Sequence, residues 1–305
     1  MAEVHRQIEL LGIEQARALA TDKHERAAVD AAFRLMSGDD PTLALVHAGF
    51  ALTCLPHRLH PATVWRREGA SATMLVESGY DANGSPVGVP YGAKARMILC
   101  YLQSEAIRKN SRRVELGGSM RAFMRRMGMS VGGATYRVVG EQTRRVCSAR
   151  LTFLWRLDKA ERRVNGAFVR ESLLFFDEED RQNKLWQEEV ELDEGFYESL
   201  RKHSVPLQEE ALRAISDNSL AIDIYVWLAY RLHVLERDTK VPWPALMGQF
   251  GAGFGLMKNF RPCFLRALKL ALAVYPEAVV NLTDGGILLT PSRPPVPHRT
   301  PALTA

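Results

Sequence analysis

The sequence is poor in cysteine and contains no long uninterrupted apolar segment. Its four cysteines, Cys54, Cys100, Cys147 and Cys263, are scattered over 305 residues and form no C-x-x-C pair. Isolated cysteines are typical of free thiols in a reducing compartment rather than of a disulfide framework. No apolar run approaches the ~20 residues of a transmembrane helix, and the opening residues do not form a signal peptide. We therefore expect a cytoplasmic protein with no membrane partner.

Motifs that would indicate an enzyme are also missing. The chain contains no G-K-[ST] phosphate loop, and the glycine-rich residues 251–255 lack the spacing and the preceding strand of a dinucleotide-binding fingerprint. The paired histidines of rolling-circle nicking enzymes are absent, because an arginine and a leucine separate His57 from His60. We therefore predict a protein without catalytic residues or cofactors.

A metal site is the other chemistry to consider. Cys54, His57 and His60 lie three residues apart, and His47 is nearby. Metal ligands at this spacing would have to share one face of a helix, but Pro56 and Pro61 disfavour a helix there. We therefore interpret these side chains as loop residues and predict no metal site.

Acidic residues are absent or rare in two parts of the chain, whose net charge of +5 is modest for its length. Residues 239–276 contain no Asp or Glu, and Glu141 is the only acid between Leu116 and Leu157. Both segments are rich in arginine or lysine. Positive charge that is clustered in this way predicts an anionic partner.

The acid-free segment at residues 239–276 predicts a basic helix. Helical spacing places Lys258, Arg266 and Lys269 opposite an apolar side, and Pro262 suits the first turn of such a helix. A short helix at residues 244–250 precedes it. Two apolar runs around an Asp-Gly-Gly turn, within residues 278–290, predict a β-hairpin after it.

The segment between Leu116 and Leu157 predicts a similar arrangement. A helix over residues 134–150 would carry arginines opposite an apolar side that includes Val139 and Val146. Glu141 lies among these arginines, and we favour its pairing with Arg137 or Arg145 over a contact to cytosine. Two strands are expected next, at residues 151–157 and 167–176, with residues 158–166 as the loop between them.

The order helix, turn, basic helix, hairpin is that of a winged helix-turn-helix module. Because it occurs twice, the sequence predicts an α+β fold with two tandem winged-helix domains. The expected division is a helical arm at 1–44, a first winged-helix domain at 45–180, a second at 181–292 and a disordered tail at 293–305. For the arm, a mobile segment and a dimerisation or DNA-contact segment are both open.

Four stretches of the chain resemble the plasmid-encoded RepA replication initiators. They are GVPYGAKAR at 88–96, SMRAFMRRMG at 119–128, IDIYVWLAYR at 222–231 and ALAVYP at 271–276. The resemblance extends over roughly residues 45 to 295. It implies an initiator that binds repeated sites, called iterons, in double-stranded DNA at a plasmid origin. It also implies recruitment of host replication proteins, either a helicase or a host initiator, and possible homodimers.

In related initiators the C-terminal recognition helix reads the major groove, whereas the N-terminal domain contacts the backbone and takes part in dimerisation. By position, Lys258, Arg261, Arg266 and Lys269 match the reading helix. The complete set of residues that we expect at DNA adds the N-terminal helix and its flanking strands: Arg137, Arg144, Arg145, Arg150, Arg162 and Arg163.

Other interpretations of the same residues stay open. Charged helix faces are often simply solvated, and Arg162 and Arg163 could belong to an exposed turn. A winged-helix transcriptional regulator without a replication role would carry the same features. So would a protein-interaction module that uses winged helices without contacting DNA, although the exclusion of acids around both basic helices argues against it.

Overall fold

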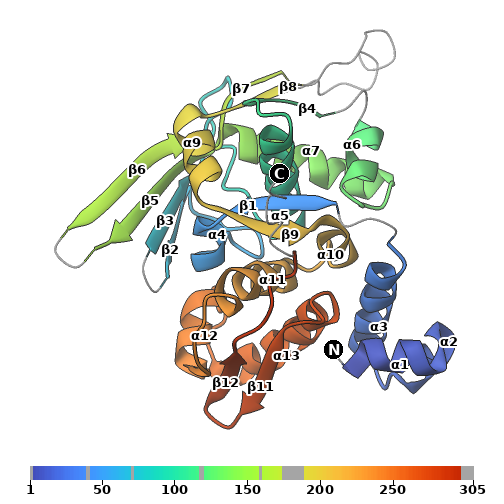
Figure 1. Cartoon of the computed structure of the whole chain (residues 1–305). Coiled ribbons are helices and arrows are strands. Elements are labelled where there is room, and N and C mark those ends of the chain that lie inside the picture. Colours follow the sequence, from blue (N-terminus) through green and yellow to red (C-terminus); the bar gives the residue numbers. More distant parts are fainter. Residues whose placement is uncertain are drawn as a thin grey trace, which may run out of the picture.

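Helices pack against four small antiparallel sheets in the computed structural model, which describes residues 3–38, 42–69, 72–116, 120–157, 160–173 and 189–296. The expected α+β class is therefore confirmed. Figure 1 shows three parts: a helical arm, a body that holds most of the strands, and a mainly helical body beneath it. No helix within the described ranges is long and apolar enough to cross a membrane.

The N-terminal arm consists of α1 (Glu3–Leu11), α2 (Ile13–Leu19) and α3 (Lys23–Met36). Asp22 begins α3 as its N-cap, because its carboxylate accepts hydrogen bonds from the backbone N–H groups of His24 and Glu25. Most of the arm's buried side chains form a small apolar cluster that Ala273 of α13 joins, whereas Ala31 of α3 belongs to the main core of the molecule.

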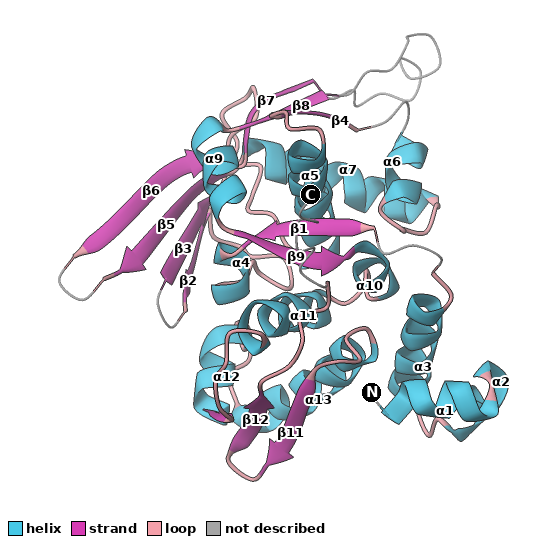
Figure 2. Cartoon of the chain, in the orientation of Figure 1, coloured by secondary structure: helices cyan, strands magenta, loops and turns pink. Residues whose placement is uncertain are grey.

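The upper body is organised around α5 (Gly92–Arg108), whose side chains are buried over most of its length. Three sheets surround it in Figure 2. The largest has the order β2-β3-β5-β6 and the second β4-β8-β7, whereas β1 pairs with β9 alone. The strands are β1 (Leu43–His47), β2 (Val64–Glu68), β3 (Ala72–Glu77), β4 (Arg113–Glu115), β5 (Arg150–Arg156), β6 (Glu161–Ala167), β7 (Val169–Leu173), β8 (Glu189–Leu192) and β9 (Ser204–Gln208).

The other helices of this body lie between those strands in the chain. They are α4 (Gly49–Leu52), α6 (Met120–Arg126), α7 (Gly133–Ser148), α9 (Glu194–Lys202) and α10 (Glu209–Ala214). Gly128 ends the segment after α6 with a positive φ of 64°, a conformation that glycine adopts without strain. This glycine lets the chain turn sharply between α6 and α7.

The lower body contains α11 (Ser219–Leu232), α12 (Trp243–Phe250) and α13 (Met257–Ala273). Its sheet has the order β10-β12-β11, built from β10 (Thr239–Pro242), β11 (Val279–Thr283) and β12 (Gly286–Thr290). The expected hairpin within residues 278–290 is therefore present. Tyr225 of α11 is fully buried, and one continuous apolar core joins the upper and lower bodies.

Three sequence expectations need correction. The segment expected to be a loop at 158–166 contains most of β6, which pairs with β5 along its whole length. The expected boundary at residue 180 does not divide the fold, because β8 and β9 pair with strands of the upper body. Pro262 is not in the first turn of α13, since that helix begins at Met257.

The part of the expected tail that the structure describes is attached to the body. Tyr275 donates a hydrogen bond to the backbone carbonyl of Arg293, and Gln208 donates one to the carbonyl of Pro295. The expectation of disorder thus does not hold for residues 293–296. The remaining residues of the tail lie outside the described ranges.

Candidate nucleic-acid interface

Helix α7 separates its basic side from its apolar side as the sequence predicted. Val139 and Val146 are buried against the main core, whereas Arg137 and Arg144 are exposed. Thr143, on the buried side, turns its hydroxyl back to the carbonyl of Val139 at 2.8 Å. The polar atom on the inner face is thus satisfied within the helix, and α7 presents its arginines outward from a firmly packed support.

Arg145 has a different environment from the other two arginines of α7. Its side chain is only 12% exposed and pairs with Glu141 of the same helix at 2.9 Å. It also donates a hydrogen bond to the carbonyl of Val89 at 3.1 Å and lies 5.2 Å over the ring of Tyr91. The expected intrahelical pair of Glu141 is therefore present, with Arg145 as the partner. Arg145 fastens the segment before α5 to α7.

Gly88 leaves the space that the Arg145 side chain needs to reach Val89. Its φ is +91°, and a Cβ at this position would lie 2.0 Å from a guanidinium nitrogen of Arg145. Only glycine leaves room for the arginine in that backbone conformation. A second hydrogen bond joins the same two segments: the side-chain oxygen of Gln142 accepts from the backbone N–H of Tyr91 at 2.8 Å.

The strands that follow α7 carry the remaining candidate cations of the upper body. Arg150 opens β5 and is exposed, as are Arg162 and Arg163 on the edge strand β6. Arg163 pairs with Glu161 on its own strand at 3.2 Å. The structure thus brings these cations onto the β5–β6 hairpin rather than onto a loop.

Helix α13 carries four exposed cations above a buried apolar side. Phe260, Phe264 and Leu268 are buried. Lys258, Arg261, Arg266 and Lys269 are exposed. The Arg261 guanidinium lies 5.0 Å over the ring of Trp243, which fixes its position at the side of the helix. The expected two-sided helix is therefore present, with the cations outward.

Lys269 is paired with a residue of the N-terminal arm. Its ammonium lies 2.7 Å from the carboxylate of Glu25. The same carboxylate accepts hydrogen bonds from the backbone N–H and the hydroxyl of Thr21. The Lys269 ammonium and these Thr21 donors lower the pKa of Glu25 to about 2. No sequence pattern indicates this contact, because 244 residues separate its partners.

A cleft of about 570 Å³ lies where the arm and both bodies meet. Arg58 and Arg266 are the cations of its lining, and none of its described lining residues is acidic; Arg266 of α13 and His24 of α3 line it from distant parts of the chain. The lining consists of His24, Pro56, His57, Arg58, Leu59, His60, Trp65, Asn218, Ser219, Leu220, Ala252, Gly253, Phe254, Cys263, Arg266 and Ala267. The cleft thus has one cation from the upper body, Arg58, and one from α13, Arg266, in its lining.

A buried polar cluster lies beneath this cleft. The carboxylate of Asp223 in α11 receives two hydrogen bonds from Arg96 in α5, each 2.7 Å long. Arg96 also donates to the carbonyls of Leu55, Pro56 and Gly92. Both side chains are more than nine-tenths buried. These two residues come from two of the four RepA-like stretches, and sequence reasoning missed their contact.

Candidate metal ligands occur in the same cluster. Within the described residues, the ligand atoms of Cys54, His57 and Asp223 lie within 4.8 Å of one another. However, Arg96 already holds both oxygens of Asp223 and adds a positive charge beside any incoming cation. Burial raises the pKa of Cys54 to about 11, which disfavours the thiolate that a metal would bind. The residues therefore fit an ion-pair network better than a metal.

The other two histidines considered as ligands lie elsewhere. His47 is buried in the core, where it contacts Ser199 and Gly49. His60 packs its ring against the edge of Trp65 at 5.0 Å. The loop containing Cys54, His57 and His60 is therefore a packing segment between the two bodies.

Comparisons with known proteins bear on the fold and the family. A family model described as "Plasmid encoded RepA protein" matches residues 89–243. The crystal structure of domains 2 and 3 of RctB is similar with a TM-score of 0.54 and 11% identity, covering 82% of this chain and 98% of that chain. A second RctB domain 2–3 structure has a TM-score of 0.48 and 9% identity, covering 79% and 94% of the two chains. No curated protein matches the sequence.

Proposed function

Because the chain belongs to the family of plasmid-encoded RepA proteins, we propose that it is a plasmid replication initiator that binds repeated sites in double-stranded origin DNA. Its role is to hold origin DNA and recruit host replication proteins, and it carries out no chemical reaction of its own. The compartment of this activity is the cytoplasm, where plasmid DNA is replicated. A homodimer is a further state that the family resemblance suggests.

The order of the elements supports two winged-helix modules. In the first, α6 and α7 are joined by a turn and followed by the β5–β6 hairpin. In the second, α12 and α13 are joined by a glycine-rich turn and followed by the β11–β12 hairpin. In such modules the second helix enters the major groove and the hairpin lies beside the backbone. This assigns α7 and α13 as the recognition helices.

The observation that carries the proposal is the outer side of α13. Lys258, Arg261, Arg266 and Lys269 are exposed above buried aromatic side chains, in a segment of 38 residues without an acid (239–276). A helix packed in this way is rigid enough to present cations to phosphates and base edges. Arg137 and Arg144 of α7, with Arg150, Arg162 and Arg163 of the β5–β6 hairpin, would add contacts to the backbone.

Binding to origin repeats tests this assignment. Anisotropy titrations with labelled repeats should show tighter binding than to a scrambled duplex, and affinity should fall steeply as salt rises. The double variant Lys258→Ala, Arg266→Ala should lose the preference for the repeats. A matched variant, Lys202→Ala, Arg237→Ala, removes the same charge at exposed positions outside both helices and should keep it. Equal loss in both variants would show that only net charge matters.

A replication assay separates an initiator from a transcriptional regulator, since both would bind DNA. A plasmid that carries only this gene and its flanking DNA should replicate in a host that supplies no other initiator. Tandem repeats of about 20 bp beside the gene are expected, because a pair of winged helices spans about two helical turns. Origin binding without replication would favour the regulator.

A further inference from the structure

The N-terminal arm lies on the same side of α13 as the cations. At about 100° per residue, Lys258, Arg266, Lys269 and Ala273 fall within about 80° of one another on this helix. Ala273 is nevertheless only 1% exposed. It is buried because the arm covers it, since its apolar neighbours belong to the arm's core. Figure 1 shows α3 alongside α13, with the two helices packed together.

The contact consists of small apolar side chains. Ala28, Val29 and Ala32 of α3 join Ile8 and Ala16 of the other arm helices, and Ala273 of α13 completes the cluster. Leu270 of α13 packs against its edge. Because alanine contributes little apolar area, this cluster buries much less surface than the main core. The contact of the arm with α13 is therefore modest, and α3 is held in addition by Ala31, which joins the main core, and by its packing against α10.

A carboxylate of the arm occupies the position of a DNA ligand. Glu25 is held in place by two hydrogen bonds from Thr21, and it pairs with Lys269 at 2.7 Å. A carboxylate and a DNA phosphate each carry one negative charge, and both accept charge-assisted hydrogen bonds from a lysine ammonium. A DNA phosphate that binds the Lys269 ammonium at this position would have to replace the Glu25 carboxylate.

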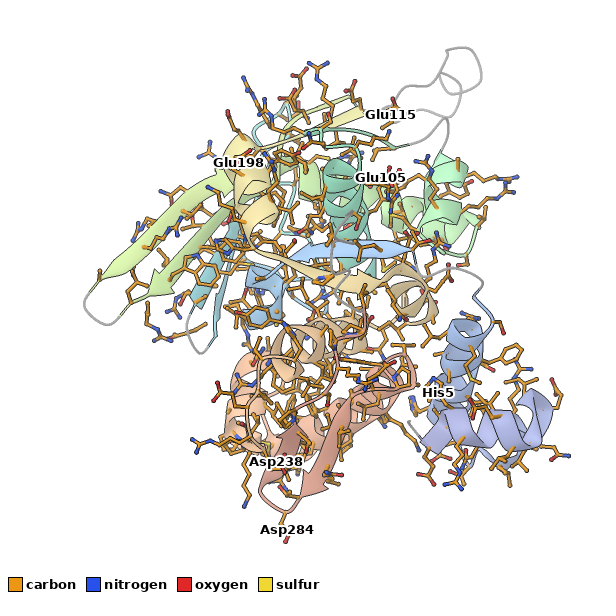
Figure 3. All side chains as sticks on the ribbon, viewed as in Figure 1. His5, Glu105, Glu115, Glu198, Asp238 and Asp284 are labelled. Carbon is orange, nitrogen blue, oxygen red and sulfur yellow. The ribbon has the colours of Figure 1, made fainter. Side chains whose placement is uncertain are left out.

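One buried side chain of the arm weakens its attachment. His5, labelled in Figure 3, is 4% exposed and lies by a cleft that Gln208, Glu210 and Pro276 of the bodies also line. Neither of its ring nitrogens has a hydrogen-bond partner among the described residues. A buried imidazole without partners costs free energy that is recovered in water. Release of the arm would return this side chain to solvent.

We propose that the arm, α1 to α3, is a reversible cover of the DNA-binding side of α13, and that origin DNA and the arm compete for this side. The inference rests on the proposed function, because it assigns a regulation to the same surface. In the covered state Lys269 is paired with Glu25, and α3 packs over Ala273 on the same side of α13. DNA binding to this side of the helix requires displacement of α3.

Two neighbouring alanines of α3 allow a matched test in the full-length chain. Ala28→Asp places a charge in the buried contact, whereas Ala27→Asp places the same charge at an exposed position of the same helix. If the covered state prevails about ten to one, Ala28→Asp should tighten origin binding about tenfold, because the apparent Kd depends on the fraction of competent protein. Ala27→Asp should leave the affinity unchanged or slightly weaker.

A substitution that keeps the arm packed tests whether the charge of Glu25 opposes DNA binding. Glu25→Gln keeps the acceptor for Thr21 but removes the charge that pairs with Lys269. It should tighten origin binding by about two- to fivefold, which corresponds to the loss of one exposed ion pair. In a Lys269→Ala background the same substitution should have no effect on affinity.

Hydrogen exchange of the arm shows its position directly and separates the possible failures. Exchange of the α3 amides should rise in Ala28→Asp without DNA, and in the wild type when origin DNA is added. If the wild type binds origin DNA and Ala28→Asp frees the arm without a gain in affinity, the arm is not a cover, and the proposed initiator function is unaffected. Protection of the arm by DNA also overturns the proposal that the arm is a cover, since the arm would then be a DNA contact. If Ala28→Asp frees the arm and neither protein binds DNA, the proposed function itself fails.

Discussion

Arg96 of α5 and Asp223 of α11 form a two-pronged ion pair between the upper and lower bodies, with both hydrogen bonds 2.7 Å long. The remaining donors of Arg96 are taken by three backbone carbonyls. The guanidinium is therefore fully satisfied in a place where water has no access. This pair, together with the continuous apolar core, fixes the orientation of α11 against α5.

Removal of one partner of this pair should strongly destabilise the protein. Asp223→Asn keeps the shape of the side chain but leaves the buried guanidinium without its countercharge, and such changes cost about 3–5 kcal/mol. The free energy of unfolding from urea titrations measures the effect. Arg96→Met should cost a similar amount, and the double variant should cost less than the sum.

An ion pair with an exposed carboxylate, between the same two regions, is the control. Lys94 of α5 pairs with Asp217, which precedes α11 and is 84% exposed. Asp217→Asn makes the same chemical change in a solvated position and should cost less than about 1 kcal/mol. Equal costs at positions 217 and 223 would show that burial does not determine the value of the pair.

Substitution by alanine should affect binding at Arg137 and stability at Arg145. Arg145→Ala removes hydrogen bonds from a partly buried cation to Glu141 and Val89, so it should lower the free energy of unfolding by about 1.5–3 kcal/mol. Arg137→Ala, at an exposed position, should change stability by no more than about 0.5 kcal/mol and weaken origin binding. Each variant is measured in both assays. A stability loss in Arg137→Ala as large as that in Arg145→Ala would contradict the distinction.

Helical periodicity explains why the two sides of α7 and α13 could be predicted. The alternation of apolar and basic residues every three to four positions is a local property, and it placed Val139 and Leu268 inward and Arg137 and Arg266 outward. The pair of Arg145 with Glu141 is local as well, but its contact with Val89 is not. Val89 lies 56 residues earlier in the chain, so the same periodicity placed Arg145 on the DNA-facing side.

Strand β6 and the Arg96–Asp223 pair were missed for other reasons. In β6 the residues Glu161, Arg162 and Arg163 are all exposed, so the strand shows none of the alternation that reveals a half-buried strand. For the buried pair a signal was present. Asp223 is an acid within an otherwise apolar helix, and Arg96 adjoins the apolar stripe of α5. A buried charge requires a partner of opposite sign, and the two could have been matched.

Acidification should destabilise the protein in part through His47. Burial, and then His203, lower the pKa of His47 from 6.5 to about 4. The unfolded chain therefore binds the proton more readily, and stability is complete above pH 6.5 and lost as the pH falls toward 4. One nitrogen of the ring accepts a hydrogen bond from the backbone of Gly49, and the other contacts the hydroxyl of Ser199.

This linkage predicts a measurable difference between two proteins. Between pH 7.5 and pH 5.5, the wild type should lose about 1.4 kcal/mol of unfolding free energy through His47. His47→Gln retains an acceptor and a donor without a titrating group, so its own loss over this range should be smaller by that amount. Urea titrations at the two pH values give both numbers. Identical losses in the two proteins would exclude His47 as the source.

The β5–β6 hairpin should contribute phosphate contacts rather than sequence preference. Arg162 and Arg163 are exposed on the edge strand β6, where the wing of such a module runs beside the backbone. If each neutralises one phosphate, alanine at both positions should reduce the slope of log affinity against log salt by about 1.8. Affinity for origin and scrambled duplexes should fall by the same factor. Arg66→Ala, at an exposed position on β2 at the opposite edge of the sheet, should leave the slope unchanged. A loss confined to the origin duplex would instead make the hairpin a base-reading element.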